Sequence, residues 1–96
     1  MDLRVYFFHT SWCTKCKEFD KKLETDKTIP NIVPIDADTA PQEMIDTFDV
    51  QGLPTFVLVD KDENILGKLE SPNSFNELLG WYQGLTEKLK GDNNVN

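Results

Sequence analysis

The order in which apolar runs alternate with amphipathic stretches constrains this 96-residue chain more than any other feature. Residues 3–8 and 29–35 are apolar and rich in β-forming side chains, so each run predicts a buried strand. Between them, residues 13–27 place apolar side chains at helical spacing among lysines and glutamates, which predicts an amphipathic helix. The apolar stripe of this helix consists of Cys16, Phe19 and Leu23.

The second half of the chain predicts a short helix, a hairpin and a long helix. Asp38 or Thr39 is expected to cap the short helix, with Pro41 in its first turn. Strands at residues 55–59 and 65–69 are separated by a turn of hairpin length. The inner face of the short helix is expected to carry Met44, Ile45 and Phe48.

The last helix has clear signals at both ends. Residues 71–74 (SPNS) are expected to start it, with Ser74 and Glu77 fitting a capping box, and Gly91 is expected to end it. We therefore expect one domain over residues 1–90 and a frayed tail over residues 91–96. The apolar stripe of this helix comprises Phe75, Leu78, Leu79, Tyr82, Leu85 and Leu89.

The complete order is strand, helix, strand, helix, strand, strand, helix. A strand–helix–strand crossover followed by a hairpin predicts an α/β fold, in which three helices flank both faces of a four-stranded mixed sheet. Pro30 and Pro34 are expected at the ends of the second strand, since proline cannot donate to a ladder.

Charge and hydropathy exclude two classes of partner. The net charge is −7, and residues 28–96 carry four basic against twelve acidic side chains, so the chain lacks the basic surface that nucleic acids require. No apolar run approaches the roughly 20 residues of a membrane-spanning helix. The first residues have no basic flank or apolar stretch of a secretory signal, and we expect a cytoplasmic, monomeric protein.

Two cysteines, Cys13 and Cys16, are too few for a disulfide scaffold, and their spacing indicates a redox pair or half of a metal site. Thr10, Ser11 and Trp12 offer turn and N-cap chemistry just before them, so Cys13 is expected at a helix N-terminus. Unpaired N–H groups and the helix dipole there favour a thiolate. Cys13 is thus predicted to be the more exposed and more acidic thiol, and Cys16 the buried resolving one.

These features resemble the thioredoxin family. The matching residues are WCTKCK at positions 12–17 and GLPT at positions 52–55, in the right places in the element order. The resemblance covers residues 3 to about 89 and implies a minimal thioredoxin-like fold and thiol–disulfide exchange between Cys13 and Cys16. Such exchange needs no metal or organic cofactor.

The resemblance also implies a substrate-binding surface. It predicts a cis peptide between Leu53 and Pro54, with the Leu53 backbone offered to an extended substrate and Trp12 as an apolar rim. Lys15 and Lys17 are candidates for stabilising the thiolate, although they also fit solvated helix charges. The implied partners are disulfide-containing proteins and an electron donor, either a reductase or a small thiol.

Three departures from the family bear on the chemistry. The chain lacks the extra N-terminal strand and helix of full-length thioredoxins. Phe7 stands where thioredoxins usually bury an aspartate, and residues 29–35 hold no lysine to pair with one. The dipeptide between the cysteines is Thr14-Lys15, so a family reduction potential does not transfer. His9 is a candidate proton carrier in place of the aspartate, and a structural histidine is the alternative.

Other functions remain open at this point. A zinc site normally takes four ligands, and Cys13, Cys16 and His9 supply three at most, although a zinc or iron–sulfur site shared between two chains is an alternative. A redox-inactive docking module is a second alternative. A glutathione-dependent, glutaredoxin-type redoxin is a third, although Gly67 stands alone where glutaredoxins carry a Gly-Gly pair.

Overall fold

The structure is a computed structural model that describes residues 2–94. Its elements follow the expected order of strands and helices. In sequence they are β1 (Arg4–His9), α1 (Thr14–Thr25), β2 (Ile32–Asp36), α2 (Gln42–Thr47), β3 (Thr55–Val59), β4 (Ile65–Glu70) and α3 (Phe75–Asn94).

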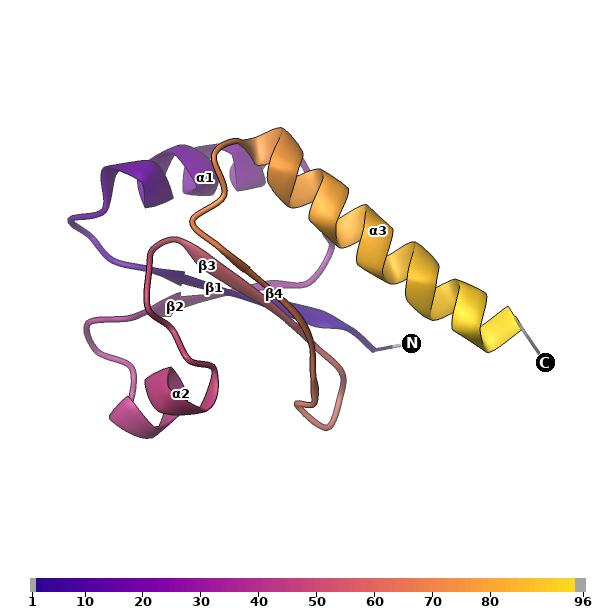
Figure 1. The fold of residues 1–96 in the computed structure, drawn as a ribbon. Helices are drawn as coiled ribbons and strands as arrows, with labels where there is room; N and C mark the ends of the chain where they lie inside the picture. Colours follow the sequence, from indigo (N-terminus) through magenta and orange to yellow (C-terminus); the bar gives the residue numbers. More distant parts are fainter. Residues whose placement is uncertain (1, 95–96) are drawn as a thin grey trace.

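The strands form one four-stranded mixed sheet in the order β2-β1-β3-β4, which confirms the predicted fold class. β1 pairs with β2 in parallel and with β3 antiparallel, and β3 pairs antiparallel with β4. Figure 1 shows α1 and α3 on one side of the sheet and α2 on the other. The crossover through α1 makes β1 and β2 parallel, while the short turn after β3 makes the hairpin antiparallel.

Alternation along the two central strands divides the core between the faces of the sheet. In β1, Val5 and Phe7 belong to a cluster with residues of α1 and α3, whereas Tyr6 and Phe8 belong to a cluster with Phe48 beside α2. β3 alternates in the same way, and all five of its residues are buried. A strand covered on both faces is apolar throughout, which explains the continuous apolar runs in the sequence.

β2 differs from the prediction in its bounds and in the place of one proline. It begins at Ile32, three residues later than expected, and Pro30 lies before it. Pro34 lies inside the strand, opposite Phe7, rather than at its end. β2 is an edge strand with a neighbour on one side alone, and an edge tolerates a residue that has no N–H to donate.

The predicted caps of α2 are wrong. Pro41 occupies the N-cap position, and no side chain bonds to the first turn. The carboxylate of Asp38 instead accepts a hydrogen bond from the Trp12 indole, so it is engaged by a residue far away in the sequence. Asp36 shapes this connection, since its carbonyl accepts from the Ala40 N–H.

α3 begins as expected and ends later. The Ser74 hydroxyl accepts from the Glu77 N–H at 3.2 Å, while the Glu77 carboxylate accepts from the Asn73 N–H rather than from that of Ser74. The helix continues through Gly91 to Asn94, which corrects the predicted end at Gly91. No glycine in residues 2–94 has a positive φ, so Gly91 does not form a left-handed cap. The part of the expected frayed tail beyond Asn94 lies outside the described residues.

None of the helices formed by residues 2–94 is long and apolar enough to cross a bilayer.

Candidate functional site

Cys13 and Cys16 lie where β1 passes into α1, and they form a disulfide. Their Cα atoms are 5.2 Å apart, as the first turn of a helix dictates for residues three apart. The Cys16 side chain faces the core with Phe19 and is 2% exposed, while Cys13 is 8% exposed. Cys13 is therefore the more accessible of the two, although both sulfurs are largely covered in this oxidised form.

Cys13 itself caps α1. It has extended backbone angles, φ −86° and ψ 105°, and its Sγ accepts a hydrogen bond from the Cys16 N–H at 3.2 Å. This corrects the expectation that residues 10–12 would supply the cap. A sulfur in the N-cap position receives an N–H that would otherwise lack a partner, and the first turn of α1 contains no acidic residue. Backbone N–H groups at a helix start favour negative charge on an atom in this position.

The two lysines of the motif differ in their surroundings. Lys15 is half-buried and its Nζ lies 3.5 Å from the carbonyl oxygen of Ser71, whereas Lys17 is exposed. Neither forms an ion pair with a carboxylate among residues 2–94.

Residues 52–55 form a loop that leads into β3. The Leu53–Pro54 peptide is cis, as the resemblance implied. The loop is held by the Thr55 hydroxyl, which donates to the Gly52 carbonyl, and by the Ser71 N–H, which donates to the Pro54 carbonyl at 2.8 Å. Pro54 is buried, and Leu53 is half-buried between the two core clusters.

Trp12 stands beside this loop and is 67% exposed. Its indole Nε1 donates to the Asp38 carboxylate at 2.8 Å, which fixes the ring although its faces remain open to solvent. A small cavity of about 170 Å³ brings together Thr10, Trp12, Asp38 and Leu53. The Thr10 hydroxyl is buried and has no hydrogen-bond partner among the described residues.

The structure therefore brings Trp12, Leu53 and the cysteine pair together, and adds residues that the sequence did not single out for the site. Asp38 was interpreted as a helix cap and Ser71 as part of a helix start. No local pattern marks either, because Asp38 bonds to a residue 26 positions away and the Ser71 hydroxyl to a residue 18 positions away.

This geometry agrees with comparisons to known proteins. Residues 3–85 match a family model described as a thioredoxin-like domain. The chain belongs to the thioredoxin-like family. No match of comparable significance was found among curated protein sequences.

Solved thioredoxins share this fold. The chain is similar to a mutant thioredoxin from Halobacterium salinarum, with 24% identity and a TM-score of 0.73 over 88% of this chain and 75% of the other. It is also similar to thioredoxin 1 from Thermosipho africanus, with 20% identity and a TM-score of 0.72 over 91% and 98%. Mitochondrial thioredoxin 3 from Saccharomyces cerevisiae is 27% identical, with a TM-score of 0.67 over 90% and 78%.

In this thioredoxin-like chain, Phe7 occupies the position where the resemblance implied a buried carboxylate in other thioredoxins. Phe7 is 1% exposed and stacks on Phe56, with ring centroids 4.9 Å apart and planes 3° apart. His9, two residues further along β1, is half-buried and lies 5.2 Å from the Phe7 ring. His9 therefore lies on the same face of the sheet as Phe7 and α1.

Within residues 2–94, no three or more His, Cys, Asp and Glu side chains are grouped so that they could hold a metal ion.

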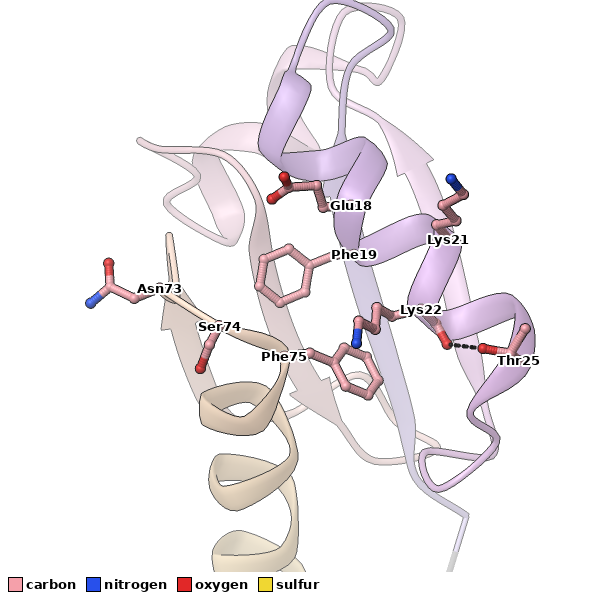
Figure 2. Close-up of a pocket in the computed structure, with 8 residues that line it drawn as sticks. All are labelled: Glu18, Phe19, Lys21, Lys22, Thr25, Asn73, Ser74 and Phe75. Carbon is pink, nitrogen blue, oxygen red and sulfur yellow. Dashed lines mark hydrogen bonds between the residues drawn. The ribbon is translucent and has the colours of Figure 1, made fainter.

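A larger cavity of about 520 Å³ lies between α1 and the start of α3 (Figure 2). Phe19 and Phe75 form its apolar walls, with Glu18 and Lys22 extending beside them. Neither cysteine lines it, nor does any residue of the 52–55 loop, so it is not part of the disulfide site.

Proposed function

We propose that this thioredoxin-like protein is a thiol–disulfide oxidoreductase that reduces disulfides in other proteins. The observation that carries the proposal is the position of the disulfide: Cys13 caps α1, and its sulfur receives the Cys16 N–H. A family fold with such a pair supports a redox role, and the exposed Trp12 beside Leu53 supports polypeptide substrates.

The proposed reaction has two steps. The Cys13 thiolate attacks one sulfur of a substrate disulfide, which forms a mixed disulfide and releases the other substrate sulfur as a thiolate that takes up a proton. Cys16 then loses its proton and attacks Cys13, which forms the Cys13–Cys16 disulfide and releases the second substrate thiol. The substrate gains two electrons from the protein and two protons, one from the Cys16 thiol and one from solvent.

Leu53, Pro54 and Trp12 have the substrate-binding role in this proposal, and Lys15 and Lys17 support the thiolate. The oxidised protein is regenerated by a reductase or by a small thiol. We further propose that the protein is a monomer and acts in the cytoplasm, where thiols are kept reduced.

Reduction of insulin by dithiothreitol tests the proposal. The wild-type protein should accelerate the reaction, and Cys13→Ser should abolish the acceleration because the attacking sulfur is missing. Cys16→Ser should retain the attack and accumulate the mixed disulfide, which mass spectrometry detects. A wild-type rate no greater than that of dithiothreitol alone would favour a docking module without turnover.

A further inference from the structure

Ser71, between β4 and α3, contacts both the loop of residues 52–55 and the helix that carries the cysteine pair. Its hydroxyl donates to the Leu53 carbonyl at 3.3 Å, and its N–H donates to the Pro54 carbonyl at 2.8 Å. Its own carbonyl accepts from Lys15, between the two cysteines. Ser71 has a φ of 44°, a conformation that is costly for a residue with a side chain and persists where its surroundings impose it.

The contact between Ser71 and the loop also depends on Gly52, which has no side chain. A Cβ atom at Gly52 would lie 2.9 Å from the Ser71 Oγ, closer than such atoms approach without a shift. The hydroxyl thus occupies the space that a side chain at position 52 would fill. The backbone at Gly52 and at Ser71 therefore allows the hydroxyl to lie beside the loop.

As a result, one of the two main-chain polar groups of Leu53 is already hydrogen-bonded. Its N–H has no hydrogen-bond partner within the part of the chain that the structure describes, whereas its carbonyl accepts from Ser71. A residue that pairs with an added antiparallel strand exchanges two hydrogen bonds, one through its N–H and one through its carbonyl. An extended substrate could therefore bond directly to the Leu53 N–H, whereas the Leu53 carbonyl oxygen already accepts from Ser71.

We propose that Ser71 is a specificity-determining residue, whose hydroxyl competes with the main-chain N–H of a polypeptide substrate for the Leu53 carbonyl oxygen. The inference rests on the proposed function, since it concerns the same substrates. Ser71 is exposed, so its hydroxyl can turn to solvent when a strand binds. A small disulfide without main-chain N–H groups does not use the Leu53 carbonyl, and Ser71 does not affect its reduction.

Steady-state kinetics on two substrates test this inference, with dithiothreitol as the reductant. Ser71→Ala removes the hydroxyl and keeps the N–H that Pro54 accepts. The KM for insulin should fall about two- to tenfold, the range expected for one net hydrogen bond, with kcat unchanged. The kinetics with 2-hydroxyethyl disulfide should not change.

Two further variants control the experiment. Ser71→Gly removes the same hydroxyl and relieves the positive φ, so it should lower the KM for insulin to a similar extent. Asn73→Ala changes an exposed side chain of the same segment that forms no hydrogen bond with other described residues, and it should leave both substrates unaffected.

An insulin KM that is unchanged or raised in both Ser71 variants would overturn the inference, because the hydroxyl would then be neutral or would position the loop. Equal changes on both disulfides would also overturn it. These results leave the proposed function intact as long as the wild-type protein reduces insulin. A wild-type protein that reduces neither disulfide would overturn the proposed function and this inference with it.

Discussion

Replacing Phe7 by aspartate tests whether the core beside the disulfide tolerates the buried carboxylate that thioredoxins usually carry at this position. Phe7 is almost fully buried in the cluster between the sheet and α1, with its ring stacked on Phe56. β2, which pairs with β1 at this position, contains no lysine to neutralise an added charge. Phe7→Asp thus combines a loss of packing with the burial of an unpaired acid.

Measurements at different pH values separate these two contributions to the lost stability, because only the burial of the acid depends on pH. Loss of the ring alone costs about 3–5 kcal/mol of the free energy of unfolding, as in other large-to-small core substitutions. Burial raises the pKa of the new carboxyl, so the folded protein holds a proton that the unfolded chain releases above about pH 3.9. Each further pH unit then costs about 1.4 kcal/mol until the folded-state pKa is reached, or about 4 kcal/mol at pH 7 if the folded-state pKa exceeds 7.

Urea unfolding of Phe7→Asp and the matched neutral variant Phe7→Asn provides the measurement. The two variants should have similar midpoints near pH 4, and Phe7→Asp should unfold at clearly lower urea near pH 7. Together the terms approach the whole stability of a small domain, about 5–15 kcal/mol, so Phe7→Asp should be partly unfolded at neutral pH. Equal midpoints for both variants at both pH values would refute the reasoning, since the carboxylate would then be solvated or paired.

Two other predictions follow from the described contacts. In the reduced protein, pulse alkylation near neutral pH should label Cys13 before Cys16, because Cys13 is more exposed and its sulfur accepts an N–H; faster labelling of Cys16 would reverse the two roles. Hydrogen bonds from Asn64 hold the pKa of Asp60 below its usual value, so this carboxylate stabilises the fold above about pH 3.9 and ceases to do so as the pH falls through its lowered pKa. The stability difference between wild type and Asp60→Ala should therefore shrink on acidification, and a constant difference would contradict this account.

The sequence was sufficient to predict the sheet and the cysteine pair because both leave local patterns. β1 and β3 are buried on both faces, so each appears as a continuous apolar run. Cys16 and Phe19 are the buried residues of α1, and they recur at helical spacing. The place of Pro34 was not predictable in this way, because it depends on β2 lying at the edge of the sheet.

The parts of the site that were not predicted arise from contacts between distant segments. Asp38 has the sequence context of a helix cap, and its bond to Trp12 depends on how the β2–α2 connection approaches the start of α1. The reach of Ser71 to Leu53 depends on a positive φ that its own side chain does not favour. The capping role of Cys13 required the conformation of the turn before α1, since cysteine is not a usual N-cap residue.

Under the proposed function, these contacts place the main influence on the reduction potential at Cys13 and the start of α1 rather than at Phe7. The Cys16 N–H and the N-terminus of α1 favour a negative sulfur at Cys13. The proposed function assigns the same effect to the charges of Lys15 and Lys17. Phe7 offers neither a charge nor a proton that would oppose them. Stabilising the thiolate stabilises the reduced form of the pair, and this moves its potential toward that of an oxidant. Under the proposed function, the helix start and its two lysines weaken the dithiol as a reductant of its substrates, and the proposed electron donor must be the stronger reductant.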